Sequence, residues 1–221
     1  RMGASPHAIL VDQSGERYMN EGGSYVLFCK NMLERHEKTP ALPSWAILDA
    51  QAVKKYGIAG ARRQSKLKNW VASGYLKTGN TLEELAIHMN ASPETLKASV
   101  ERFNGFVANN KDEDFSRGER AYDNWLGDKC HKPSATLGRI EQAPLYAVPV
   151  VPGDVGTYGG VVCNENAQVL REDGSIIEGL YATGVSTASP MGRVYPGAGS
   201  SIGPAYTFAY VAANHALNAT S

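Results

Sequence analysis

Gly179-Leu180-Tyr181-Ala182-Thr183-Gly184, followed by Tyr195-Pro196-Gly197-Ala198-Gly199-Ser200-Ser201-Ile202-Gly203-Pro204, is the stretch that decides how the chain folds. It predicts a short apolar strand, a glycine-rich loop and a helix with Pro204 in its first turn, where no hydrogen-bond donor is lost. Glycine permits backbone angles that other residues avoid, so such a loop lets a ligand touch bare backbone. Ser200 and Ser201 are expected to cap the helix, whose first N–H groups would stabilise a negative charge. The stretch therefore predicts part of an active site.

The composition excludes several classes of protein. The chain has 221 residues, 43% of them hydrophobic, and its 22 basic residues balance 22 acidic ones. Such a chain can bury a sizeable core, and a balanced charge gives no general attraction to nucleic acid or to an anionic membrane. No apolar run approaches the ~20 residues that span a bilayer. The three cysteines form no Cys-x-x-Cys pair, so neither a disulfide framework nor a zinc site is predicted, and we expect reduced thiols in the cytoplasm.

The start of the sequence gives no sign of a secretory signal. It opens at Arg1 without a charged, apolar leader, so we expect a cut or internal start. No Gly-x-Gly-x-x-Gly turn follows a strand there, although the pyrophosphate of a dinucleotide normally rests on such a turn. We therefore expect a fragment whose phosphate site lies elsewhere.

The pattern of secondary structure changes along the chain. A hairpin is predicted at the start, from a strand over 8–11 through a turn over 12–16 to a second strand at Tyr18. Helices are predicted over 25–32, 49–56, 62–72, 81–90 and 92–110, with good caps at Thr81 and Ser92. A long loop over 111–140 precedes short strands over 146–151, 161–163, 169–170, 176–177 and 180–183, and a closing helix over 204–216. We expect an α/β chain whose domain boundary lies between residues 139 and 140.

Tyr195 and Gly199 are the candidate catalytic residues of the opening stretch. A phenol and a backbone N–H that converge on one point can donate two hydrogen bonds to a carbonyl oxygen and stabilise the charge that develops as a ketone enolises. A packing tyrosine in a glycine turn is the alternative interpretation. A second glycine cluster, over 152–160, could bring backbone close to a flat cofactor or form a simple hairpin.

Other patterns are interpreted as having no function. The basic residues between Lys54 and Lys68 lie on predicted helices, where runs of charge usually face solvent. Ser65-Lys66-Leu67-Lys68 matches the Ser-x-x-Lys of serine acyltransferases, but its companion motifs are missing. The five histidines show no metal-ligand spacing, so no metal is predicted.

Five segments in the last third carry a further pattern, which extends to Val11-Asp12, Asn20-Glu21 and the helical middle. They are residues 143–148, 153–160, 179–184, 191–199 and 202–205. Together they resemble the 3-ketosteroid Δ1-dehydrogenases, flavoproteins of the fumarate reductase/succinate dehydrogenase superfamily. The resemblance implies part of a mostly helical α+β substrate-binding cap domain, 1–139, and the C-terminal portion of a Rossmann-like FAD-binding domain, 140–221. It also implies that an N-terminal FAD-binding segment is missing.

Departures from the fumarate reductase pattern bear on the substrate. Gly156 and Met191 stand where those enzymes have histidines, and Tyr195 stands where they have a substrate-clamping arginine. A dicarboxylate needs cationic partners, whereas a tyrosine can hydrogen-bond a neutral ketone without leaving a buried charge. The departures therefore favour an apolar ketone.

The resemblance implies FAD-dependent introduction of a C1–C2 double bond into a 3-ketosteroid, a reaction of steroid degradation. Tyr195 and Gly199 would polarise the C3 ketone, and Tyr25 would remove the C2 proton, with Tyr18 as the alternative base. Hydride would pass from C1 to flavin N5. The residues implied to bind FAD, without a covalent bond, are Gly159, Gly160, Gly184, Val185, Gly199, Ser200, Ser201 and Ile202, although Val185 replaces the polar residue usual at its position.

Two alternatives stay open at this point. The first is an FAD-dependent desaturase or reductase that acts on a smaller cyclic ketone. The second is a non-catalytic fragment or binding module that lacks the ADP-binding turn.

Overall fold

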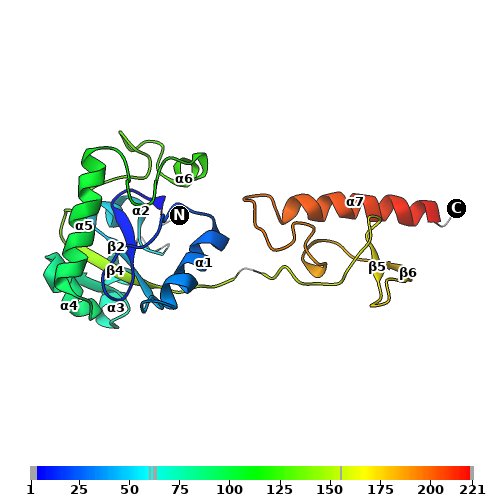
Figure 1. Ribbon diagram of the computed structural model, residues 1–221, viewed down its shortest axis with the longest axis horizontal. Coiled ribbons are helices and arrows are strands. Elements are labelled where there is room, and N and C mark those ends of the chain that lie inside the picture. Colours follow the sequence, from blue (N-terminus) through cyan, green and yellow to red (C-terminus); the bar gives the residue numbers. More distant parts are fainter. Residues whose placement is uncertain (1–3, 60, 62–63, 155, 220–221) are drawn as a thin grey trace. The chain divides into compact units, whose positions relative to one another are not determined.

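A four-stranded antiparallel sheet organises the first part of the chain in the computed structural model (Figure 1). The structure describes residues 4–59, 61, 64–154 and 156–219. The strands are β1 (Ala8–Val11), β2 (Ser44–Leu48), β3 (Lys77–Gly79) and β4 (Leu145–Val150), and they lie in the order β1-β2-β4-β3. Ile47 of β2 is therefore in register with Ile9 on one side and Ala147 on the other.

Six α-helices are found among the described residues of the same part of the chain. They are α1 (Tyr25–His36), α2 (Ala50–Tyr56), α3 (Gln64–Ala72), α4 (Leu82–Met89), α5 (Pro93–Ala108) and α6 (Ala121–Leu126). The first five were expected from the sequence, and the caps at Thr81 and Ser92 are confirmed, since each hydroxyl oxygen accepts a hydrogen bond from the N–H three residues later.

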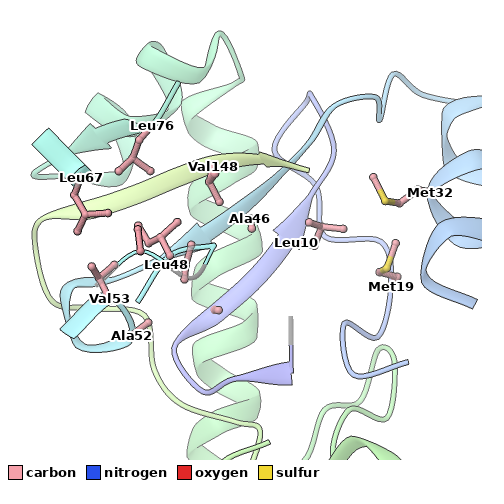
Figure 2. Packing of buried hydrophobic residues seen from close by; sticks show 13 residues of the cluster. Leu10, Met19, Met32, Ala46, Leu48, Ala52, Val53, Leu67, Leu76 and Val148 are labelled. Carbon is pink, nitrogen blue, oxygen red and sulfur yellow. The ribbon is translucent and has the colours of Figure 1, made fainter. Parts of the chain in front are cut away.

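The alternation of side chains along the strands builds two apolar clusters, one on each face of the sheet. Ala8 and Leu10 of β1 face a cluster that includes Met32 of α1, Val53 of α2 and Leu67 of α3; Figure 2 shows most of its members. Ile9, Val11 and Ile47 face the other cluster, with α4 and α5, whose members include Leu85, Leu96 and Phe103. Because successive strand residues point to opposite faces, one short buried strand serves both clusters.

Three predictions for this region are corrected by the structure. The turn over 12–16 forms, with the Gly15 N–H donating to the Asp12 carbonyl oxygen, but the second strand of the predicted hairpin is reduced, among the described residues, to an isolated bridge between Val11 and Arg17. The strands β2 and β3 lie in segments that the sequence pattern left unassigned. The predicted loop over 111–140 contains the short helix α6.

The second part of the chain begins at Gly153, and the first extends to Pro152. It contains β5 (Gln168–Leu170) and β6 (Ile176–Tyr181), which form an antiparallel pair, then the short 3₁₀ helix η2 (Gly184–Ser186) and α7 (Ile202–Ala219). The predicted closing helix is confirmed. The two short strands predicted over 176–183 are one strand, and the strand predicted over 161–163 is reduced to isolated bridges of Val161 with Thr187 and of Cys163 with Val169.

The two units differ in how much apolar surface they bury. Within the described residues, the buried hydrophobic side chains of the second unit are those of Ala167 and Val169, whereas the first unit has two full clusters. α7 has no buried residue, and Tyr206, Tyr210 and Leu217 are each about 70% exposed or more. Among the described helices, none combines the length and the apolar character needed to cross a bilayer.

The mixed helix and sheet architecture confirms the expected α/β class. The division after Pro152 places β4, a central strand of the sheet, in the first unit. The domain boundary predicted between 139 and 140 would instead assign β4 to the second part of the chain, and it stays a prediction.

Candidate active site

Tyr25 is the first residue of α1 and belongs to the first unit. The Ser24 hydroxyl caps this helix by accepting a hydrogen bond from the Leu27 N–H at 3.5 Å. The Tyr25 side chain is 62% exposed, so it can be reached by a ligand. The partial positive charge at a helix N-terminus favours a negative charge in its first turn.

Tyr18, the alternative base, has a different environment. Its hydroxyl shares a hydrogen bond of 2.7 Å with the Ser44 hydroxyl, and burial raises the pKa of Tyr18 to about 12. It lines a pocket of about 370 Å³ whose walls mix apolar side chains such as Leu27 and Phe115 with charged ones such as Arg35. A phenol that is harder to ionise is a weaker candidate for removing a proton near neutrality.

A buried network of charges anchors the chain just before Tyr25. Arg17 donates two hydrogen bonds to Glu21, both at 2.9 Å, and two to Asp112, at 3.0 and 2.7 Å. The guanidinium lies 5.1 Å from the ring centroid of Phe103 and 5.0 Å from that of Phe115, on the two aromatic rings that shield it from water.

A second guanidinium joins the network from the segment that was predicted to be a loop. Arg117 is buried and donates to Glu21 at 3.0 Å and to the carbonyl oxygens of Ala8, Ser5 and Thr136 at 2.7 to 2.8 Å. Its hydrogen bonds tie the start of the chain to residues more than a hundred positions away. Such a pairing is stabilising only as a whole, because removing one partner leaves a buried charge.

The pKa values of the network follow from burial and pairing. Burial alone would raise the pKa of Glu21, but the guanidinium groups of Arg17 and Arg117 outweigh it and hold the pKa below its usual range. Burial likewise would lower the pKa of Arg17, and its carboxylate partners Glu21 and Asp112 raise it above the ordinary value. Glu21 is therefore an anion that accepts bonds and not a proton donor.

Asn20, beside Glu21, is held by α6. Its side-chain amide donates to Asp123 Oδ2 at 3.0 Å and to the Phe115 carbonyl oxygen at 3.2 Å, while its Oδ1 accepts from the Gly22 N–H at 2.8 Å. Asp123 is fully buried, and its Oδ1 has no hydrogen-bond partner in the described part of the chain. The turn that leads into Tyr25 is thus fixed at both Asn20 and Glu21.

The glycine cluster of the second unit brings backbone segments into close contact. A Cβ at Gly160 would lie 2.4 Å from the Thr187 carbonyl carbon and 2.7 Å from the Ser186 carbonyl oxygen, so a side chain cannot fit there. The Val161 N–H donates to Ser186 beside it. Gly159 has no such neighbour within 4 Å. Gly160 therefore allows the loop to lie directly on η2.

The loop after β6 is fastened to α7. The Thr183 hydroxyl donates to the Ala205 carbonyl oxygen at 2.9 Å, and a Cβ on Gly184 would lie 3.3 Å from the Ala205 Cβ. Val185 follows, with its side chain 83% exposed. The structure therefore brings Gly160, Gly184 and Val185 together around η2 at the start of α7.

Tyr195 and Gly199 lie in the loop that leads into α7. Tyr195 is half-buried. Gly199 has φ of +96°, the left-handed region that disfavours a side chain, and its carbonyl oxygen accepts the Gly203 N–H at 2.8 Å. Within the described residues, the Gly199 N–H donates to no acceptor. This amide is available to a ligand.

The serines after Gly199 do not act alike. The Ser200 hydroxyl turns back, donating to the Gly197 carbonyl oxygen at 2.6 Å and accepting from its N–H, so the expectation that Ser200 caps α7 is wrong. Ser201 and Ile202 are exposed at the helix start, and the Ser201 carbonyl oxygen accepts from the Ala205 N–H. Ser200 therefore stabilises the loop rather than the helix.

These residues fit a flat cofactor that is bound through backbone. The Gly199 amide is a donor, and the N-terminus of an eighteen-residue helix favours negative charge, while Gly160 lets the neighbouring loop pack on η2. No group of three or more His, Cys, Asp or Glu residues that could hold a metal occurs within the described residues. Tyr25 belongs to the first unit, and Tyr195 and Gly199 belong to the second.

Sequence reasoning missed the residues that support Tyr25. The side chains of Arg17, Asp112, Arg117 and Asp123 are spread over a hundred positions, and the last three lie in a polar stretch that looks like a surface loop. The one available signal was Asn20-Glu21, a polar pair directly before a predicted helix. Its partners could not be identified without the fold.

Comparison with protein families gives one matching model, described as an FAD binding domain, over residues 3–202. The chain is also 42% identical over 217 residues to the 3-oxosteroid 1-dehydrogenase of Mycobacterium tuberculosis (strain ATCC 25618 / H37Rv), a match over 96% of this chain and 38% of that protein. It is 37% identical to the 4-oxocyclohexanecarboxylate 2-dehydrogenase of Sinomonas cyclohexanicum, over 94% of this chain and 36% of that protein.

Among solved structures, the chain is similar to the 3-ketosteroid Δ1-dehydrogenase of Sterolibacterium denitrificans in complex with 1,4-androstadiene-3,17-dione. The TM-score is 0.86 at 36% sequence identity, and the match covers 98% of this chain and 39% of that one. The chain thus spans about two fifths of the length of the relatives that it matches.

Proposed function

Because the chain belongs to the FAD binding domain family, we propose that it forms the cap portion and the C-terminal flavin-domain portion of an FAD-dependent 3-oxosteroid 1-dehydrogenase. Similarity to 3-oxosteroid 1-dehydrogenases over nearly the whole chain supports the proposal. The observation that carries it is the loop before α7, which contains a half-buried phenol, Tyr195, and four residues later the Gly199 amide, which donates to no acceptor among the described residues. Two uncharged donors suit a neutral ketone.

In this proposal each residue has one task. The Tyr195 hydroxyl and the Gly199 N–H donate hydrogen bonds to the C3 ketone oxygen and stabilise the negative charge that develops there. Tyr25, as the phenolate, takes the proton from C2, which the polarised ketone has made more acidic. The C2–H electron pair then forms the C1–C2 double bond as hydride leaves C1.

Bound FAD supplies the two-electron acceptor for this hydride. The residues that would hold it are the glycines around η2, Gly159, Gly160 and Gly184, with Val185, and the start of α7 from Gly199 through Ser200 and Ser201 to Ile202. Gly160 keeps the loop close to η2, and the start of α7 would favour negative charge on a bound group.

The proposal includes the setting in which the chain works. A further FAD-binding segment would complete the cofactor site, since the chain spans about two fifths of its relatives and carries no dinucleotide turn. The exposed apolar side chains of α7 would be covered in the complete flavoprotein. Reduced thiols and neutral charge are consistent with the cytoplasm.

Replacing Tyr195 with phenylalanine tests the proposal. We expect Tyr195→Phe in the complete flavoenzyme to lower turnover of a 3-ketosteroid by about 10²-fold or more, because one donor to the developing oxyanion is lost. Turnover is measured at steady state with an artificial electron acceptor, and flavin content is read from the absorbance spectrum. Tyr75→Phe, which removes the hydroxyl of an exposed tyrosine in the first unit, is the matched control. Equal turnover in Tyr195→Phe and wild-type enzyme would end the assignment.

A second candidate function is dehydrogenation of a smaller cyclic ketone, favoured by the likeness to the Sinomonas cyclohexanicum dehydrogenase. Such a substrate keeps the ketone that Tyr195 and Gly199 would hold but adds a carboxylate that needs a cationic partner. Comparing kcat/KM for a 3-ketosteroid and for 4-oxocyclohexanecarboxylate separates the two. A higher value for the cyclohexane acid would favour the second candidate.

A further inference from the structure

We propose that Asp123 is a positioning residue for Tyr25, acting through Asn20 and Gly22. The inference deepens the proposed function and rests on it, because it takes Tyr25 as the base. We call Asn20, Gly22, Gly118 and Asp123 the Asp123 clamp. All of them belong to the first unit, so the contacts that follow are internal to it.

The clamp is a short chain of hydrogen bonds that ends at the turn before α1. Asp123 Oδ2 accepts from the Asn20 side-chain amide at 3.0 Å and from the Gly118 N–H at 3.1 Å. The other end of the same amide group, Asn20 Oδ1, accepts from the Gly22 N–H at 2.8 Å. The Asn20 side chain therefore links a carboxylate on α6 to the Gly22 N–H, three residues before Tyr25.

The clamp also works by direct contact. A Cβ on Gly22 would lie 3.0 Å from Asp123 Cγ and 3.1 Å from Asp123 Cβ, so the backbone of the turn rests against the carboxylate without a side chain between them. The Gly23 N–H donates to the Asn20 carbonyl oxygen at 3.4 Å, and Ser24 then caps α1. Because Gly22 and Gly23 have no side chains to hold the turn, its course into Tyr25 depends on Asn20 and its neighbours.

Asp123 is not explained by stability alone. Its side chain is fully buried, and one carboxylate oxygen has no hydrogen-bond partner in the described part of the chain. None of the ion pairs between described residues includes Asp123. A buried carboxylate with an unsatisfied oxygen costs free energy, so its presence needs an explanation other than stability. Holding the turn through the other oxygen, Oδ2, offers one.

The Asp123 clamp would affect the reaction by setting the position of Tyr25 relative to the proton that it removes. A base must lie within hydrogen-bond reach of the proton that it removes, and a displacement of about 1 Å can cost about 10²-fold in rate. The Glu21 network fixes the turn on one side, and the Asp123 clamp fixes it on the other. Loss of the clamp should therefore slow proton removal while leaving the ketone-binding residues of the second unit unchanged.

The test compares two substitutions at one position in the complete flavoenzyme. Asp123→Ala removes both accepted hydrogen bonds, whereas Asp123→Asn keeps an oxygen that can accept both. We expect Asp123→Ala to lower kcat, and the washout of deuterium from C2 of a labelled 3-ketosteroid, by about 10²-fold. We expect Asp123→Asn to restore most of both rates. Dissociation constants for the dienone product, titrated by flavin absorbance, should stay within about twofold in each variant.

Two further variants separate positioning from a general loss of structure. Trp125→Ala removes an exposed side chain from the same helix and should leave kcat unchanged. In a Tyr25→Phe background, Asp123→Ala should cause no further loss of kcat, because a positioning residue has no effect once the group it positions is gone. If Asp123→Ala does not fold, Asn20→Ala breaks the same contact from the other side and carries the same expectations.

The outcomes distinguish this inference from the proposed function. If Tyr25→Phe retains turnover, the proposed role of Tyr25 is wrong, and the positioning role fails with it. If Tyr25→Phe loses turnover but Asp123→Ala keeps it, this inference alone is wrong. It is also overturned if the two losses multiply in the double variant, or if Asp123→Asn is as slow as Asp123→Ala.

Discussion

Glu21 accepts hydrogen bonds from two guanidinium groups and from one backbone amide, and its side chain has no exposed surface. The partners are Arg17, Arg117 and the Leu10 N–H of β1. One carboxylate thus joins the first strand, the turn before α1 and the segment before α6. Losing this carboxylate would cost free energy of folding, because each guanidinium would stay buried without its full set of hydrogen-bond acceptors.

We expect Glu21→Gln to lower the free energy of unfolding by about 3–5 kcal/mol at neutral pH, because it leaves two buried cations without their shared anion. The pKa of Glu21 is lower in the folded state than in the unfolded chain. Its contribution is therefore fully present above the unfolded-state pKa, about 4.3, and is lost as the pH falls through the folded-state pKa.

Urea denaturation from pH 7 into the acid range measures this dependence. The wild-type free energy of unfolding should fall more steeply with acid than that of Glu21→Gln, and the two curves should converge. Glu34→Gln, on the exposed side of α1, is the control. Parallel curves for wild type and Glu21→Gln would show that the pKa of this carboxyl is not lowered on folding.

At the scale of the element, helix caps differ in how far their effects reach. The Ser92 hydroxyl oxygen accepts one backbone hydrogen bond, from the Thr95 N–H of α5. Asp49, the cap of α2, is fully buried and accepts from the Ala52 N–H, from the Gln51 side chain and from the backbone N–H groups of Glu141 and Gln142. Asp49 thus fastens α2 to the segment that leads into β4.

We expect Ser92→Ala to lower the free energy of unfolding by about 1 kcal/mol, the usual loss for a helix cap. Asp49→Ala should cost at least about 2 kcal/mol, because it also leaves buried backbone donors without an acceptor. Thermal or urea unfolding of the two variants side by side gives the comparison. An equal loss for both would contradict the bridging role of Asp49.

Helices were easier to predict than strands for a physical reason. Thr81 and Ser92 cap their helices by accepting hydrogen bonds from backbone N–H groups three positions later, so the sequence signal is local. β2 gains its hydrogen bonds from β1 and β4, and β4 follows it by about a hundred residues. α6 is only six residues long and has no side-chain cap, so the polar stretch around it hid its start.

The same contrast applies to the site. Tyr195 and Gly199 stand out because glycines and a proline surround them within ten positions. Tyr25 was identified as a candidate only through the family resemblance, because it follows Asn20-Glu21 by a short interval in the sequence. Arg117 and Asp123, which hold that pair, are close to it only in the folded unit, so no window of sequence contains them together.

At the scale of the whole molecule, the two units depend on their surroundings to different degrees. The first has a sheet with an apolar cluster on each face and a buried network of charges. The second exposes Tyr206, Tyr210 and Leu217 along α7 and buries few apolar side chains within its described residues. Burial of apolar surface is the main source of stability. The first unit therefore has far more stability of its own than the second.

We expect a fragment of residues 1–152 to unfold cooperatively and a fragment of residues 1–139 to remain without fixed tertiary structure. The shorter one ends where the sequence placed the domain boundary, and it lacks β4, whose residues pair with both β2 and β3. Without it, the sheet loses the strand that joins its two halves.

Near-ultraviolet circular dichroism and urea titration of both fragments provide the measurement. The longer fragment should show a single transition with fixed aromatic signals. A cooperative transition in residues 1–139 would instead support the earlier boundary.

The position of β4 has a consequence for how the chain is made. The strands β1, β2 and β3 leave the ribosome before β4, and β3 meets the rest of the sheet only through β4, which is translated about seventy residues after it. At the usual pace of about 5–20 residues per second, the nascent chain spends several seconds with the edges of β2 and β3 unpaired. During that interval, a chaperone has its best opportunity to bind.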